Sequence, residues 1–173
     1  MAQDYNIKVE GRAYLLRPDT PPEGVSRPPR AGETEDELSE PLRSQVREAN
    51  LVMRPPRVTP NTTRILEATE YAQQQGKFME FHHAAYQAYW EGRKDLGDLA
   101  VIADLARSVS LDSAQLLERL ESGYYTPAVM EQYQDALHHG IRGIPTFVVG
   151  NLLFTGAHPY EIFQSAMQRV LEG

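Results

Sequence analysis

The sequence predicts an α/β protein in which a long helical block lies between two ends that contain strands. Apolar and polar residues alternate within residues 6–16, which is the pattern of a half-buried strand. From about residue 38 to residue 140, apolar residues recur every three or four positions almost throughout, which predicts amphipathic helices. Two β-rich runs and a last amphipathic segment follow. Strands are therefore expected only near the two ends of the chain.

The N-terminal part is predicted to contain one strand and one long loop. Ile7 and Val9 alternate with polar neighbours in the strand, and Gly11 is placed at a bulge. The following residues, 17–32, hold five of the twelve prolines of the chain. Because proline lacks a backbone N–H and fixes φ, this density excludes helix and sheet interior. We expect an extended loop at the surface there.

The helical block is expected to be divided by capping residues and by glycines. Helix starts are predicted at Asn61 or Thr62, at Asp112 or Ser113 and at Thr126, and helix ends at Gly76, Gly123 and Gly140. Helices of this length are marginal in isolation. They are therefore expected to pack on one another or on a sheet.

The C-terminal part is predicted to be a hairpin followed by a helix. The runs "TFVVG" (146–150) and "LLFTG" (152–156) are rich in β-forming residues and are separated by Gly150-Asn151, a turn signal. Pro159 suits the first turn of the last helix. The apolar face of that helix is expected to consist of Ile162, Phe163, Ala166, Met167 and Val170.

The composition excludes several classes of function. The net charge of −7 and pI near 5.2 argue against nucleic acid or an anionic membrane as a partner, since both need a basic surface. No apolar run approaches the roughly 20 residues that span a bilayer, and the first residues lack the pattern of a secretory signal. We therefore expect a cytoplasmic protein. The absence of cysteine removes disulfides, thiolate zinc sites and thiol nucleophiles from this chain.

No metal site is expected from the remaining chemistry-bearing residues. The histidines form two adjacent pairs and one single residue, and adjacent helical positions point about 100° apart. Glu80 and His83 have Glu-x-x-His spacing, but a di-iron bundle needs two such motifs and two further glutamates. Tyr86, Tyr89 and Trp90 either belong to the core or line a ligand cleft.

Several motifs in a shared order carry a resemblance to a known family. They are "LLRPDTPPEG", "PNTTRILEATEYAQQQGKF", "AYW" and "GIRGIPTF…GAHPYE", within a match from about Val9 to Leu171. The chain resembles DsbA-like thioredoxin-fold oxidoreductases of the FrnE-type subgroup, with relatives among 2-hydroxychromene-2-carboxylate isomerases and kappa-class glutathione transferases. The resemblance implies a thioredoxin-like fold whose halves, residues 1–37 and 141–173, flank a helical insertion domain, residues 38–140.

The resemblance also implies a substrate-binding face but no catalytic residue. In the family the proline before the third strand is cis, so we expect a cis Ile144–Pro145 bond. The Ile144, Pro145 and Thr146 backbone would then bind an extended peptide or a glutathione-like ligand by strand addition. The family's first strand and helix, which carry Cys-x-x-Cys, are absent from this sequence. Direct thiol–disulfide exchange by this chain is therefore excluded.

Three functions stay open from the sequence. In the first alternative the chain is a DsbA-like oxidoreductase that lacks its catalytic dithiol because of truncation or a misassigned start. It then takes no cofactor. Alternatively it is a non-catalytic module that binds a peptide or assembles with another chain. In the third alternative it is a relative of the glutathione-dependent isomerases and transferases, and glutathione is then the expected cofactor.

The missing first strand leaves a stability problem, because it is the central neighbour of the cis-proline strand in this fold. Each buried unpaired backbone group costs about 1–3 kcal/mol. We therefore expect a fragment of a longer protein, a strand donated by a partner or by a second copy in a homo-oligomer, or direct pairing of the flanking strands at 6–16 and 146–150.

Overall fold

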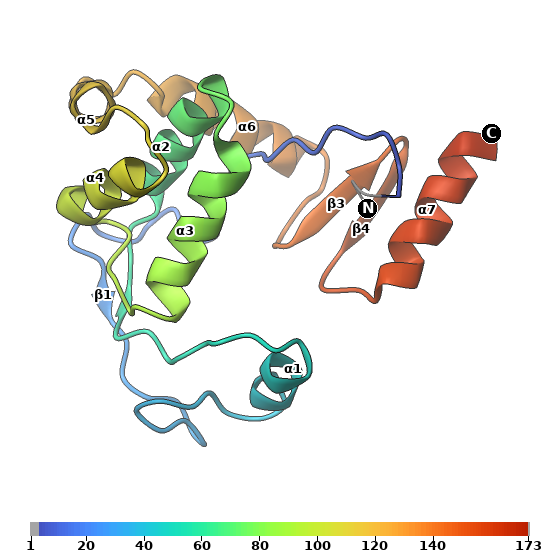
Figure 1. The fold of residues 1–173 in the computed structure, drawn as a ribbon, viewed down its shortest axis with the longest axis horizontal. Helices are drawn as coiled ribbons and strands as arrows, with labels where there is room; N and C mark the ends of the chain where they lie inside the picture. The colour runs from blue at the N-terminus through green and yellow to red at the C-terminus, as the bar shows by residue number, and fades with distance from the viewer. Residues whose placement is uncertain (1–3, 173) are drawn as a thin grey trace. The chain divides into compact units, whose positions relative to one another are not determined.

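The computed structural model describes residues 4–172 and divides into two compact units (Figure 1). One unit contains the described residues up to Leu16 together with those from Glu131 onward, and the other is Arg17–Met130. The assignment of residues 1–37 and 141–173 to the halves of a thioredoxin motif, and of residues 38–140 to an insertion, stays a prediction.

The core of the Arg17–Met130 unit is a group of short helices packed on one another (Figure 1). Their bounds are α2 Thr63–Gln74, α3 Phe78–Trp90, α4 Leu99–Ser108 and α5 Ser113–Glu121, and α6, Thr126–His138, starts in the same unit. Their fully enclosed large apolar side chains are Phe81, Ile102, Leu116, Leu120 and Val129. Each helix buries one face, as its apolar periodicity predicts.

Capping side chains and glycines mark the ends of these helices, largely at the positions that the sequence predicts. The carboxylate of Asp112 accepts the N–H groups of Ala114 and Gln115, both at 3.0 Å. The Asn61 side chain accepts the Thr63 N–H at 3.0 Å. The predicted stop residues all have positive φ, at Gly76, Gly123 and Gly140. Thr126 differs from prediction, since it is the first residue of α6 and its hydroxyl donates to the Glu67 carboxylate.

Glu67 is a charged residue inside this helical core, with 1% of its surface exposed. One of its oxygens accepts from Thr126 Oγ1, and the other lies 3.1 Å from Arg64 Nη1. The Arg64 guanidinium also donates to the Leu120 carbonyl. The buried carboxylate is therefore fully paired, as burial of a charge requires, and it joins α2 to the start of α6.

Residues 17–62 are less helical than predicted. The segment contains α1, Leu42–Glu48, and two short antiparallel strands, β1 Val25–Ser26 and β2 Val58–Thr59. The predicted extended loop at 17–32 contains β1, whose two residues are not proline and pair in a two-stranded sheet that has no interior strand. The helical prediction is wrong for residues 49–62, where three prolines interrupt any helix.

The predicted strand at residues 6–16 is not present as a strand. The segment lies along α6, where the Ala13 N–H donates to Gln132 Oε1 at 2.6 Å and the Tyr14 ring meets Tyr133 edge-on. A strand needs a ladder partner, and a side chain of α6 takes the N–H instead. The predicted bulge at Gly11 therefore has no ladder, and direct pairing of residues 6–16 with 146–150 does not occur.

The C-terminal hairpin and helix form where they are predicted, but of the predicted apolar face of the helix Ile162 and Val170 are exposed. Strand β3, Thr146–Val149, pairs antiparallel with β4, Leu152–Thr155, and α7, Tyr160–Glu172, follows. Gly150 has a φ of 60° in the connecting turn, while Asn151 does not have positive φ, which is the pattern of a type II′ turn. Figure 1 shows α7 beside this hairpin.

Candidate functional site

The predicted substrate-binding residues lie together in the loop that leads from α6 into β3. Ile144 and Pro145 are joined by a cis peptide bond, and half of the Ile144 surface is exposed. The Pro145 carbonyl accepts the Gly156 N–H at 2.8 Å, and the Thr146 hydroxyl donates to the Gly143 carbonyl at 2.7 Å. These bonds attach the loop to the end of β4 and fix its path into the strand.

The hydrogen-bond pattern of the hairpin shows which backbone groups of β3 point away from β4. The two-residue turn makes Val149–Leu152 a hydrogen-bonded pair, and Phe147 then forms the next such pair with Phe154. The hydrogen bond from the Gly156 N–H to the Pro145 carbonyl continues the same alternation. The N–H and C=O groups of Thr146 and Val148 therefore point to the opposite side, which we call the outer edge of β3, and Ile144 lies just before this edge, across the cis bond.

No hydrogen bond occupies the outer edge of β3 within residues 4–172. The sheet there consists of β3 and β4 alone among the described residues. Val148, which lies on this edge, is 63% exposed. The edge is thus a row of accessible backbone donors and acceptors with the geometry needed to add a strand.

The two faces of the hairpin differ. On one face the rings of Phe147 and Phe154 pack edge-on against Phe163 of α7, with centroids 4.8 and 5.2 Å away. On the other face Val148 and its cross-strand neighbour Leu153 are exposed, the latter by 48%. One face thus anchors the hairpin to α7, and the outer edge borders an apolar face.

The chemistry of this site is restricted to backbone groups, apolar side chains and a few uncharged polar side chains such as Thr146. Residues 143–157 include no ionisable side chain, and the whole chain has no cysteine. His158 lies just beyond and its Nε2 is 2.9 Å from the Thr155 carbonyl. Nothing in this window can attack a disulfide, so the site can bind an extended chain but supplies no nucleophile.

The structure also bears on metal binding and on membrane insertion. Within residues 4–172, no group of histidine and acidic side chains is arranged to hold a metal ion. Glu80 pairs with Lys77 at 3.2 Å instead. No helix among the described residues has the length and apolarity to cross a membrane.

The aromatic residues considered for a cleft lie on α3. Tyr86 is exposed and its ring lies tilted against that of His82, with ring centroids 4.6 Å apart. Burial lowers the pKa of His82 below its usual value, and the neighbouring His83 lowers it further. Tyr89 and Trp90 are half-buried and meet edge-on. Their role in a ligand cleft stays a prediction.

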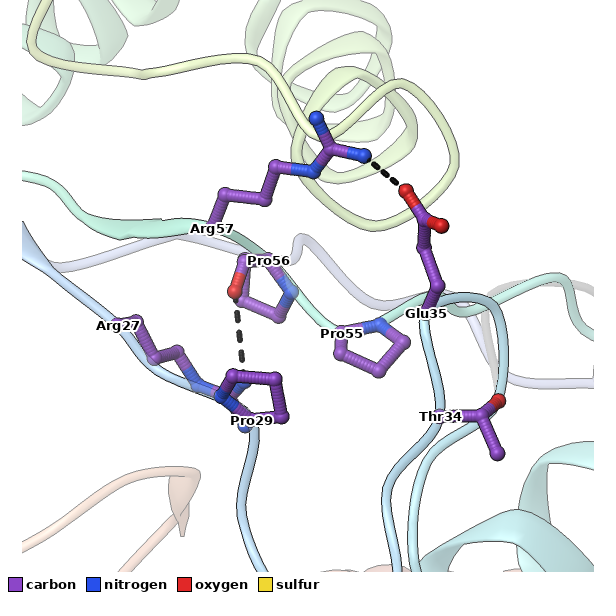
Figure 2. Close-up of a pocket in the computed structure, with 7 residues that line it drawn as sticks. All are labelled: Arg27, Pro29, Thr34, Glu35, Pro55, Pro56 and Arg57. Carbon is purple, nitrogen blue, oxygen red and sulfur yellow. Dashed lines mark hydrogen bonds and ion pairs between the residues drawn. The ribbon is translucent and has the colours of Figure 1, made fainter.

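A pocket of about 540 Å³ that the sequence does not predict lies in residues 27–57. Its walls contain Pro29, Pro55 and Pro56 (Figure 2). At its rim Arg57 donates to Glu35, and Arg27 donates to the Pro56 carbonyl at 3.3 Å (Figure 2). Both guanidinium groups have acidic partners, so the pocket presents no free cation to a ligand.

The acidic stretch "ETEDELSE" forms an ion-pair network that sequence reasoning missed. Each of its carboxylates pairs with an arginine, through the pairs Glu33–Arg27, Glu35–Arg57, Asp36–Arg54 and Asp36–Arg93, Glu37–Arg43 and Glu37–Arg47, and Glu40–Arg43. The sequence signal for this network was the alternation of acidic and arginine-rich stretches. The network links the acidic stretch to α1, which contains Arg43 and Arg47, and to Arg93 beyond α3.

Comparisons with known proteins agree with this fold. The chain is 27% identical to the uncharacterized protein YwbO of Bacillus subtilis (strain 168) over 65% of this chain and 58% of that protein. It superposes on a "probable DsbA oxidoreductase" from Streptomyces coelicolor with a TM-score of 0.69 and 21% identity, covering 75% of this chain and 57% of the other.

A second solved structure has the same fold. It is a 2-hydroxychromene-2-carboxylate isomerase, with a TM-score of 0.68 and 18% identity over 75% of this chain and 64% of that one. The chain thus spans less than two thirds of the length of each of these proteins. The family model described as "DSBA-like thioredoxin domain" matches residues 1–168. The predicted α/β thioredoxin-like fold is therefore confirmed, and the chain belongs to the family of DSBA-like thioredoxin domains.

Proposed function

We propose that this chain is the substrate-binding part of a DsbA-like thiol–disulfide oxidoreductase of the FrnE type, located in the cytoplasm, and that it contains no redox centre itself. Its substrate is an extended peptide, which adds as a strand to the outer edge of β3. The loop Ile144–Pro145–Thr146 binds one end of that strand. No step of disulfide exchange is carried by residues of this chain, because it has no thiol.

One observation carries the proposal: the backbone groups of Thr146 and Val148 point away from β4 and have no partner within residues 4–172, and the half-exposed Ile144 directly precedes them. Each N–H···O=C bond to a peptide contributes about 0.5–1.5 kcal/mol net, so the row as a whole supports measurable affinity. Because backbone groups are the same in every peptide, this mode of recognition tolerates many sequences. Tolerance of this kind suits a protein that acts on varied polypeptides.

The proposal is tested with a fluorescent, cysteine-free peptide of alternating Val and Thr, whose binding is followed by fluorescence anisotropy. Ile144→Pro removes the N–H with which the loop before β3 is proposed to bind the peptide, and should weaken binding roughly five- to tenfold. Ile144→Val is the matched control, since it keeps that N–H, and should bind like the unchanged chain. Equal affinity of all three proteins, or no binding by any, contradicts the proposal.

A direct binding measurement distinguishes the alternative of a glutathione-dependent isomerase relative. Glutathione is titrated into the chain without the peptide, and binding is measured by isothermal titration calorimetry. If the chain binds glutathione and does not bind the peptide, the isomerase or transferase relationship replaces our proposal. The solved isomerase supports a shared fold and no more, because its identity with this chain is 18%.

A further inference from the structure

The pocket in residues 27–57 has the size and the walls of a small-molecule site. Such sites commonly enclose about 300–1,000 Å³ and are lined mainly by apolar groups, with a few polar groups that fix the orientation of the ligand. This pocket encloses about 540 Å³, and the rings of Pro29, Pro55 and Pro56 form apolar walls (Figure 2). It therefore suits the apolar body of a small ligand.

The walls of this pocket are fixed before a ligand arrives. Each proline ring holds its own φ angle. The Arg27 N–H donates to the Arg57 carbonyl at 2.8 Å, and the Arg27 guanidinium donates to the Pro56 carbonyl at 3.3 Å. The same guanidinium donates two bonds to Glu33, which keep it in place. A preformed pocket loses little conformational entropy when a ligand binds, and this favours affinity.

The charged groups at the rim are held far less firmly than the walls. Arg57 and Glu35 reach toward each other from separate segments and share a single hydrogen bond (Figure 2). Their side chains are 67% and 70% exposed, respectively. An exposed ion pair contributes little free energy, and solvent hydrates the Glu35 carboxylate when it is released. Another carboxylate can therefore take its place on Arg57 at little cost.

This exchange requires only the Glu35 side chain to move. Arg93 donates to the Glu35 carbonyl and, at 2.7 Å, to Asp36 Oδ1. Thr34 Oγ1 accepts the Glu37 N–H at 3.0 Å. Because these bonds hold the backbone around Glu35, the wall that this loop forms stays in place when the carboxylate turns away.

We infer that this pocket binds a small apolar carboxylate, whose body lies between the prolines and whose carboxylate replaces that of Glu35 on Arg57. A guanidinium can donate two parallel bonds to a carboxylate, so the ligand gains a bond that Glu35 does not make. Burial of the apolar body provides the rest of the affinity. None of the residues that line the pocket belongs to the β3–β4 hairpin, so this site does not rest on the proposed function.

Isothermal titration calorimetry of the full chain with 2-naphthoate tests this site. 2-Naphthalenemethanol has the same ring system without the charge, and should bind roughly three- to fivefold more weakly. Arg57→Gln removes the cation and leaves Glu35 to repel the ligand, so it should weaken naphthoate binding roughly tenfold. Arg47→Gln is the matched control, because Arg47 is similarly exposed and pairs with Glu37 but does not line the pocket. It should leave the affinity unchanged.

Glu35→Gln provides a test that a failure to fold cannot imitate, because a gain of affinity is expected. The variant frees Arg57 from its competing carboxylate and should strengthen naphthoate binding roughly two- to fivefold. In NMR spectra, naphthoate should shift the amide signals of Thr34, Glu35 and Arg57 and leave those of β3 unchanged. The absence of saturable naphthoate binding, equal affinity for the alcohol, or no gain of affinity in Glu35→Gln overturns the inference.

Discussion

Glu33 shows how single side chains hold residues 17–62 in place. Its carboxylate receives Arg27 Nη2 at 2.7 Å and Nη1 at 3.0 Å, and the Arg30 N–H at 2.9 Å. The two side chains are nearly enclosed, with 3% of Glu33 and 12% of Arg27 exposed. A bidentate pair of this kind is stronger than an exposed surface ion pair, because its geometry is fixed and solvent screens it little.

This pair predicts a specific dependence of stability on pH. The hydrogen bonds from Arg27 hold the pKa of Glu33 below its ordinary value, chiefly by stabilising the ionised form. Because the folded pKa is the lower one, the pair contributes fully above the unfolded pKa of about 4.3 and is lost as pH falls below it. Melting temperatures measured between pH 3 and pH 7 should therefore fall more steeply for the unchanged chain than for Glu33→Gln. Parallel curves contradict this account.

At the scale of elements, the hairpin depends on one glycine in its turn. Gly150 has positive φ, and a Cβ added to it would lie 2.7 Å from Val170 Cγ2 of α7. Gly140 also has positive φ, but an added Cβ there meets nothing within 4 Å. Comparing alanine variants at the two glycines therefore separates the free-energy cost of backbone strain from that of steric overlap.

Gly140→Ala is expected to cost about 1–2 kcal/mol from the left-handed conformation alone. Gly150→Ala should cost about 1–3 kcal/mol more, because the hairpin and α7 must move apart. Urea unfolding followed by circular dichroism measures both values. Adding Val170→Ala to Gly150→Ala should recover part of the difference, and equal costs for the two alanine variants would show that the overlap does not matter.

The elements that the sequence predicts well are those whose signals are local. The β3–β4 hairpin follows from β-forming residues around Gly150-Asn151, and Asp112 caps α5 through neighbouring N–H groups. The strand expected at residues 6–16 is wrong because alternation shows only that a segment can form a strand. A ladder needs a partner, and the α6 side chain Gln132 takes the Ala13 N–H instead.

The candidate site is predictable only in part, because it also depends on which segments of the chain lie next to each other. Its residues, Ile144, Pro145 and Thr146, come from a resemblance to a family, and the structure places them at the entrance to β3. The outer edge extends to Val148 because no other described strand pairs with β3, and the sequence does not show which segments pair. The ion pairs of Glu33 and its neighbours join residues up to 57 positions apart, so the alternation of acidic and arginine-rich stretches indicates a network but not which residues pair.

At the scale of the whole molecule, the chain belongs to the family of DSBA-like thioredoxin domains and has no cysteine. We expect the purified chain to give no reduction of insulin by dithiothreitol above the uncatalysed rate, measured by turbidity. The same assay with a cysteine-containing DsbA-like protein is the positive control. Any acceleration by this chain contradicts the view that it contains no redox centre.

The central claim is that the outer edge of β3 binds an extended peptide through its backbone. Amide hydrogen exchange, measured by NMR with and without the Val-Thr peptide, tests it residue by residue. The account predicts that exchange slows at Ile144, Thr146 and Val148 and stays unchanged at Phe147 and Val149, whose N–H groups already face β4. Uniform protection along β3, or protection confined to residues outside the hairpin, would contradict it.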